Sequence, residues 1–157
     1  MRLRIPPRIG ALRLLAATTL AFGLVAAGNA FAADAPRVVK DPHYGDTLFH
    51  FYQDHYFTSI TTLMVSQHFS RVTHHADEAE VLRGGLLLSY GMHREAGEIF
   101  ALLIEKNAAP PVRDRAWFYL AKIRYQRSLP NEAKEALDRI EKNLPPDLEE
   151  ERILLKA

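Results

Sequence analysis

The sequence predicts an all-α fold in which about three helical hairpins stack one after another and a terminal helix follows. A small residue followed four positions later by a bulky one recurs at a stride of 37 residues: Ser59 with Leu63, Ala96 with Phe100, and Ala133 with Leu137. Apolar residues recur at helical spacing after Tyr44, and no segment alternates apolar and polar residues as a half-buried strand would. An internal period of this length is typical of repeated helical units that bury their apolar faces against one another.

The segment from Met1 to Ala32 has the features of an export signal peptide. Four arginines precede an uncharged apolar run over residues 14–27, and the small-x-small triplet Ala30-Phe31-Ala32 follows. The run is shorter than the about 20 residues that span a bilayer core. We expect cleavage near Ala32, export to a periplasm of the Gram-negative type, and a flexible lead-in over 33–43. An uncleaved N-terminal anchor is the alternative.

The charge balance and the lack of cysteine exclude several classes of protein. The chain has 20 Lys and Arg against 19 Asp and Glu. Four of the bases and none of the acids belong to the leader, so the remainder carries 16 bases, 19 acids and a net charge of −3. A chain with this net charge and with acids and bases interspersed lacks the basic stripe that is typical of a nucleic-acid binder. The absence of cysteine excludes disulfides, thiolate metal sites and cysteine nucleophiles.

The first hairpin is expected over about 44–70, with helices over 45–56 and 57–69. Leu48, Phe51 and Tyr52 form one apolar face, as Ile60, Leu63 and Met64 do on the second helix. Six aromatic residues lie between Tyr44 and Phe57, which is more than one hairpin needs to bury. We therefore expect some of them to contact a partner.

The second hairpin is expected over about 75–107. Leu82, Leu86 and Tyr90 recur at helical spacing, and Gly91 is suited to a left-handed cap at the end of that helix. The second helix, from His93 to about Asn107, is expected to bury its apolar face and expose its charged one. The buried set is Ala96, Ile99, Phe100 and Leu103.

The third hairpin is expected over about 110–145, and a terminal helix over 146–157. Pro110 suits a first helical turn, where a missing N–H costs nothing. The second helix is predicted over 131–143, with Asn131 as its N-cap and Ala133, Ala136, Leu137 and Ile140 buried. The terminal helix has two interpretations that stay open: a cap, or the first half of a truncated fourth repeat.

These residues resemble the tetratricopeptide repeat family. The third unit matches its pattern at Trp117, Leu120, Ala121, Ala133, Leu137, Ile140 and Pro145, with Arg124 where Tyr is usual; the second unit matches at Gly84, Ala96 and Phe100, and the first at Ser59 and Leu63. The resemblance covers about 44–145, and the stride of 37 exceeds the family's 34. It implies a right-handed α-solenoid in which these residues pack repeat against repeat.

No motif for catalysis or for a cofactor is apparent. All seven histidines lie between His43 and His93, yet no HxxxH or HExxH pair occurs on a helix. Metal binding through histidine is therefore a weaker alternative. The chain has no GxSxG nucleophile elbow and no glycine-rich phosphate loop. We expect neither an enzyme nor a bound cofactor, and we assign no catalytic residue.

The predicted function is a non-enzymatic adaptor or scaffold of the cell envelope. The resemblance implies a concave face, lined by the first helix of each hairpin, that binds a peptide or protein of the envelope. On that face we expect the partner-binding residues to be Tyr52, Arg83, Leu87, Tyr119 and Arg124. The alternative is a structural component of an envelope or secretion complex that oligomerises. No nucleic acid is expected as a partner, and membrane contact is expected only through an uncleaved leader.

Overall fold

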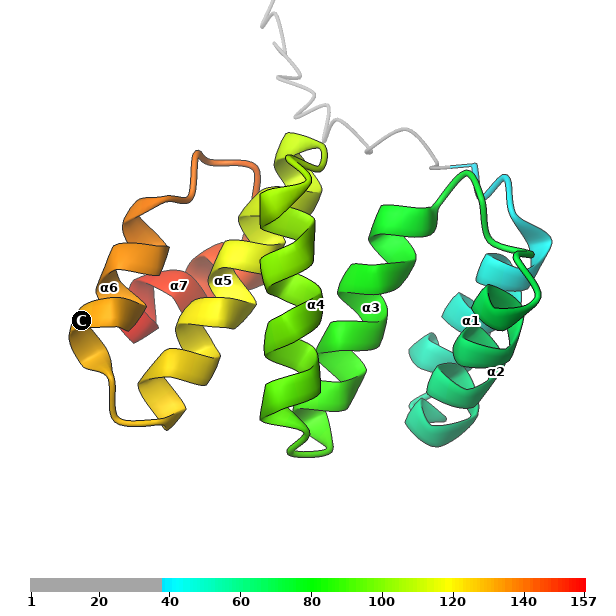
Figure 1. Cartoon of the computed structure of the whole chain (residues 1–157), viewed down its shortest axis with the longest axis horizontal. Coiled ribbons are helices and arrows are strands. Elements are labelled where there is room, and N and C mark those ends of the chain that lie inside the picture. Colours follow the sequence, from blue (N-terminus) through cyan, green and yellow to red (C-terminus); the bar gives the residue numbers. More distant parts are fainter. Residues whose placement is uncertain (1–37) are drawn as a thin grey trace, which may run out of the picture. The chain divides into compact units, whose positions relative to one another are not determined.

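The computed structural model describes residues 38–157, in which every regular element is an α-helix (Figure 1). The elements are α1 (Pro42–Tyr52), α2 (Tyr56–His68), α3 (Ala76–Ser89), α4 (His93–Glu105), α5 (Pro110–Gln126), α6 (Pro130–Asp138) and α7 (Pro146–Lys156). The all-α prediction is confirmed for these residues. The predicted signal peptide and residues 33–37 of the predicted lead-in lie outside them.

Proline opens four of the helices. Pro42, Pro110, Pro130 and Pro146 are the first residues of α1, α5, α6 and α7. The fixed φ of proline suits this position, and the N–H that it lacks would have no intrahelical partner there. The expectation for Pro110 is confirmed. The expectation that Asn131 caps the last hairpin's second helix is wrong, because Pro130 already begins α6 and Leu129 is the capping residue.

The first five helices end in the same kind of turn. At the end of α3, Gly91 has a φ of +77° and donates its N–H to the Leu88 carbonyl, while the Met92 N–H bonds to the Leu87 carbonyl. This is the Schellman arrangement, in which a left-handed residue lets the chain turn back and satisfy the last carbonyls. The predicted cap at Gly91 is confirmed. Asp54, Ser70, Asn107 and Ser128 adopt positive φ at the other four helix ends.

The 37-residue stride is also a property of the backbone. The left-handed residues Asp54, Gly91 and Ser128 follow one another at this interval, and so do Ser70 and Asn107. The second helices of the hairpins begin at the same interval, at Tyr56, His93 and Pro130. Turn geometry and side-chain pattern therefore repeat together over these three units.

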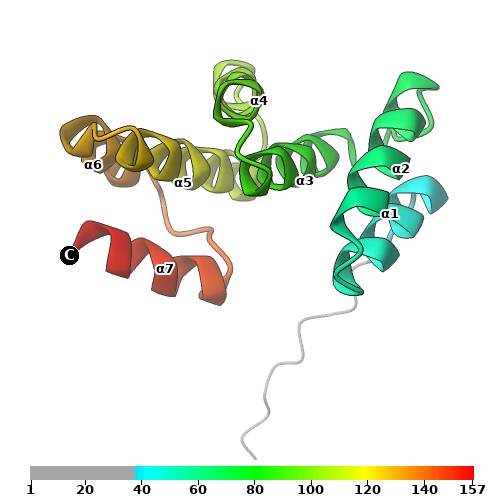
Figure 2. The same cartoon turned by 90° about the horizontal axis from the view of Figure 1, so that it is seen from below.

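The helices pair in chain order. Extensive contacts join α1 with α2, α3 with α4, and α5 with α6, which gives three antiparallel hairpins (Figure 1). The second and third hairpins are joined by contacts of α5 with both α3 and α4, whereas α2 contacts α3 less extensively than α4 contacts α5. The last helix, α7, contacts α5 and α6 and lies beside α5 (Figure 2).

Small residues allow the two helices of each hairpin to approach closely. Ser59, Ala96 and Ala133 are buried at one position of the second helix, and Thr47, Gly84 and Ala121 are buried at one position of the first. In the first hairpin the Ser59 hydroxyl donates to the Thr47 carbonyl across 2.9 Å. Helix axes separate by 8–10 Å depending on the side chains between them. The bulky partners Leu63, Phe100 and Leu137 fill the remaining space and are at most 2% exposed.

Gly84 matches the larger partner in the second hairpin. A Cβ at this position would lie 2.7 Å from two atoms of the Phe100 ring, which is too close for carbon atoms. At the corresponding positions of the other hairpins, a larger residue, Thr47 or Ala121, is found where the bulky partner is leucine rather than phenylalanine. The summed volume of the two paired side chains is thus roughly the same in the three hairpins, as close packing requires.

The third hairpin departs from the expected register. Phe118 is fully buried, with Tyr44 and Val81 buried at the same repeat position, whereas Trp117 is only partly buried. The helix predicted over 131–143 is also too long: α6 ends at Asp138, so Ile140 lies in the following loop and is half-buried. The backbone N–H groups of this loop bond to a buried carboxylate instead of continuing the helix, as described below.

Candidate functional site

The structure separates the five predicted partner-binding residues into three groups. Tyr52, at the end of α1, is 77% exposed. Arg83 on α3 and Arg124 on α5 are half-buried and reach the surface. Leu87 is buried, and Tyr119 is partly buried against Phe100. Every member of the predicted set except Leu87 therefore remains at least partly accessible.

The expectation for Leu87 is wrong, and that for Tyr119 stays a prediction for a side chain that is partly exposed. Leu87 is 8% exposed and lies in the main apolar cluster with Phe100 and Leu103. Tyr119 stacks on Phe100 with ring centroids 5.1 Å apart, and burial raises the pKa of its hydroxyl. Leu87 is therefore not available to a partner, whereas Tyr119 stabilises the contact between hairpins and stays partly exposed.

Arg83 is part of a polar network at the junction of the first two hairpins. Its guanidinium donates to Glu80 one turn earlier on α3, and Gln67 of α2 donates to the other oxygen of the same carboxylate across 2.7 Å. The Nε of Arg83 is buried and has no hydrogen-bond partner within residues 38–157. An unsatisfied buried donor is costly, so this N–H group is suited to donate a hydrogen bond to an oxygen of a bound molecule.

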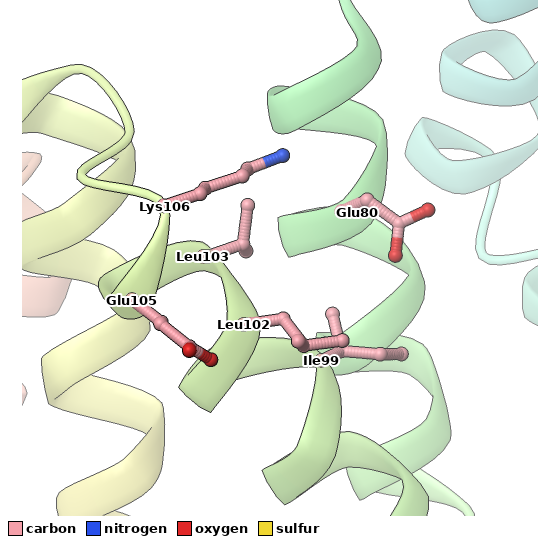
Figure 3. Close-up of a pocket in the computed structure, with 6 residues that line it drawn as sticks. All are labelled: Glu80, Ile99, Leu102, Leu103, Glu105 and Lys106. Carbon is pink, nitrogen blue, oxygen red and sulfur yellow. The ribbon is translucent and has the colours of Figure 1, made fainter.

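A shallow groove lies between α3 and α4, next to this network (Figure 3). Its volume is about 700 Å³. Ile99, Leu102 and Leu103 of α4 line it with apolar atoms, and Glu80, Glu105 and Lys106 border it with charges. Leu102 is 61% exposed, so the groove presents an accessible apolar side chain between charged ones. The groove fits a short peptide segment with an apolar side chain better than a compact polar ligand.

Arg124 lies on α5 and faces the start of α6. One guanidinium nitrogen donates to the Glu132 carbonyl across 3.0 Å, and Nε lies 3.9 Å from the Glu132 carboxylate. These contacts hold the side chain and leave several of its five donors unused. A charged side chain so held is a suitable anchor for a carboxylate.

Exposed aromatic residues gather on the first hairpin. Tyr44 is buried and Phe51 partly buried, while the other four of the six aromatics between Tyr44 and Phe57 are exposed. These four are Phe49, Tyr52, Tyr56 and Phe57. The expectation that this hairpin has more rings than it can bury is confirmed, and contact with a partner stays a prediction.

The histidines serve local structure in the part of the chain that the structure describes. The His75 ring stacks on Tyr44 and accepts the Lys40 N–H, and His74 Nδ1 lies 3.0 Å from the Asp41 carboxylate. Among residues 38–157, no three histidine, aspartate or glutamate side chains converge as a metal site would require. Histidine therefore supplies hydrogen bonds and ring contacts there.

Two buried carboxylates were missed by the sequence analysis. Asp41, just before α1, accepts the backbone N–H groups of Thr73 and His75 from the loop after α2. Burial opposes its ionisation, but the hydrogen bonds from His74 and His75 outweigh that cost and lower its pKa to about 2. The residue that precedes α1 thus binds the loop that follows α2.

Asp114 makes the corresponding contact in the third hairpin. This α5 residue is fully buried, and its Oδ2 accepts the backbone N–H groups of Glu141, Lys142 and Asn143 at 2.9–3.2 Å. Asp77 of α3 forms an ion pair with Lys106 at the exit of α4. The near-regular spacing of Asp41, Asp77 and Asp114 is the signal that could have revealed these contacts.

Comparisons with known proteins give no relative to argue from. No family model, no curated protein and no solved structure matches the chain. Within residues 38–157, none of the helices combines the length and the apolar character needed to cross a membrane.

Proposed function

We propose that the chain is a non-enzymatic adaptor or scaffold built as a right-handed α-solenoid of tetratricopeptide-like hairpins. The observation that carries this proposal is the 37-residue repetition of helix starts, of left-handed turn residues and of small and bulky buried pairs. Each hairpin leaves one apolar face for its neighbour, so the units form an extended surface rather than an enclosed pocket. Such surfaces bind peptides and proteins.

The proposed partner is a peptide or protein segment that has a carboxylate next to an apolar side chain. Arg83 supplies a charged group with an unused buried donor, and the groove between α3 and α4 supplies an apolar floor beside it. Arg124 supplies a second cation on the first helix of the next hairpin. Charge-assisted hydrogen bonds from arginine are about twice as strong as neutral ones, so two such anchors would fix the direction of the segment.

The proposed location is the periplasm. The arginine-rich start, the apolar run over 14–27 and the triplet ending at Ala32 support export and cleavage. The mass of the protein recovered from its native host tests this directly. A chain that begins at Ala33 in the periplasmic fraction is expected, and a full-length chain in the cytosolic fraction would contradict it.

Crosslinked affinity capture from the native cell envelope tests partner binding. We expect the double variant Arg83→Ala and Arg124→Ala to lose its partner. The matched control is Arg94→Ala with Arg127→Ala, which removes the same charge from exposed positions and is expected to retain the partner. If the first double variant still captures every protein that the parent captures, the assignment of the binding face is wrong.

A structural role in an envelope complex is the second candidate. The observation in its favour is the amount of apolar surface at the two ends of the repeat array. Tyr52 and Phe57 on the first hairpin are at least 70% exposed, and Leu154 on α7 is 75% exposed. Single exposed apolar residues are common, but grouped ones mark contact surfaces.

A further inference from the structure

The second helix of the first hairpin differs from the other second helices in its charge. Residues 55–70, which include all of α2, contain no Asp, Glu, Lys or Arg, and no other uncharged stretch in residues 38–157 is as long. A surface helix of a soluble protein normally carries charge on the face opposite its apolar stripe. The outer face of α2 therefore calls for a physical explanation.

That outer face is apolar as well as uncharged. Phe57, Met64 and Val65 are 70%, 48% and 53% exposed, and Phe69, just after the helix, is 60% exposed. Phe57, Thr61, Met64 and His68 follow at intervals of four and three residues, so they share one side of the helix. The opposite side bears the buried residues, including Ser59 and Leu63.

The repeat supplies an internal comparison. At the small and bulky buried positions the three second helices have matching residue types. At three of five outer positions α4 carries a charged side chain where α2 has none, and the third hairpin carries charged or polar side chains at all five. Phe57, Thr61, Met64, Val65 and His68 correspond at the 37-residue stride to Arg94, Glu98, Ala101, Leu102 and Glu105, and then to Asn131, Glu135, Asp138, Arg139 and Lys142. Packing within the repeat therefore does not require the apolar outer face of α2.

We infer that the outer face of α2 is a homodimerisation surface, on which α2 packs antiparallel against α2 of a second copy across a twofold axis. An uncharged stripe meets its own copy without like-charge repulsion, as an isologous interface requires. The first charges at either end of the stripe are Asp54 and Arg71, which are both exposed. In the antiparallel arrangement Asp54 of each copy lies near Arg71 of the other.

Details at both ends fit this arrangement. The Arg71 guanidinium lies 5.1 Å from the centre of the Phe69 ring, so its charge is held beside the stripe. Asp54 accepts the Tyr56 hydroxyl with one oxygen, and the other oxygen remains for a cation. Antiparallel helices also place opposite dipole ends together. A membrane surface fits less well, because interfacial helices carry Lys or Arg on their polar face and α2 has neither.

The small area of the α2 surface limits the affinity of the proposed dimer. A helix of 13 residues is about 20 Å long, and standard interfaces bury about 800 Å² on each partner. A contact face of this length and one helix wide is smaller than a standard interface, although Tyr52 at the neighbouring turn adds to its area. We expect a weak dimer that forms at micromolar concentrations.

Sedimentation of the full chain over increasing concentration tests the inference. The parent is expected to shift from monomer to dimer, and Phe57→Arg with Thr61→Glu is expected to stay monomeric. These substitutions give α2 the residues that α4 has at the corresponding repeat positions, Arg94 and Glu98. The fold should therefore tolerate them, and circular dichroism measures whether the helix content is retained. Leu102→Glu removes an equally exposed apolar side chain from α4 and is expected to dimerise as the parent does. Every variant has the same leader, which therefore cannot explain a difference.

Single cysteines test the geometry in a chain that otherwise has none. Met64 lies near the middle of the stripe and hence near the proposed twofold axis, and Ala101 is its exposed counterpart on α4. On mild oxidation, Met64→Cys is expected to form a disulfide-linked dimer, and Ala101→Cys is expected to form no disulfide link between copies. A parent chain that is monomeric at all concentrations, or equal crosslinking of both variants, would overturn the inference. Neither result bears on Arg83 and Arg124, so the adaptor proposal is tested separately.

Discussion

The pair Gly84 and Phe100 offers the sharpest test of the repeat packing. The fully buried Phe100 ring touches the position where a Cβ at residue 84 would stand, at 2.7 Å. The third hairpin solves the same packing problem with Ala121 and Leu137. The double variant Gly84→Ala with Phe100→Leu therefore copies a pair that the chain already uses.

Each single substitution is expected to destabilise the fold. Gly84→Ala introduces an overpacking cost of about 1–3 kcal/mol, which is partly offset by the about 1 kcal/mol that alanine gains over glycine inside a helix. Phe100→Leu removes part of a buried ring and is expected to cost about 1–2 kcal/mol, below the 3–5 kcal/mol of a change to alanine. In the double variant the smaller leucine makes room for the added methyl group.

A double-mutant cycle measured by urea unfolding gives the coupling. We expect the double variant to be more stable than the sum of the single effects predicts, by about 1–2 kcal/mol. Circular dichroism at 222 nm reports the helix content of every variant. Effects that add within about 0.5 kcal/mol would refute the idea that these two positions exchange volume across the hairpin.

Three further predictions follow from the other buried contacts. Asp114→Ala removes the acceptor of three backbone N–H groups and is expected to lower the free energy of unfolding by about 2–4 kcal/mol, whereas Asp114→Asn, which keeps one acceptor oxygen, should cost less in the same urea titration. Ala133→Leu is expected to destabilise by about 1–3 kcal/mol, while Ala101→Leu at an exposed position should have little effect on the melting temperature. The pKa of Asp41 is lowered from 3.8 to about 2, so its ionised form stabilises the fold fully above pH 3.8, and this contribution is lost as the pH falls toward 2. The urea midpoint of the parent should therefore fall more steeply over that range than that of Asp41→Asn, and parallel curves would contradict the assignment.

Helix positions were predictable because they depend on neighbours in the sequence. The spacing of apolar residues, the prolines at helix starts and the glycine at residue 91 all act within one or two turns. The register of the third hairpin was harder to predict: Trp117 and Phe118 are adjacent, and either could have faced inward. Phe118 and not Trp117 is buried because Phe118 packs against α6 and the loop that follows it. The periodicity of a single helix gives no information about that contact.

The candidate site was predicted less well than the fold. Arg83 and Arg124 reach the surface, but Leu87 is buried and Tyr119 is partly covered, because α4 covers a side of α3 and α5 that an isolated helix would expose. The groove beside Glu80 and the buried Nε of Arg83 could not be read from the sequence. The groove arises between α3 and α4, and the network around Arg83 arises where α2 meets α3, so both depend on residues more than ten positions apart in the sequence.

By itself the sequence determined the helical class, the 37-residue stride, the order of the hairpins and the uncharged character of residues 55–70. These are properties of local periodicity and composition. The packing of the helices sets which side of α2 remains exposed, which carboxylates bind the hairpin exits, and which side chains line the groove between α3 and α4. Burial is set by the elements that pack against a residue, and those elements come from distant parts of the chain.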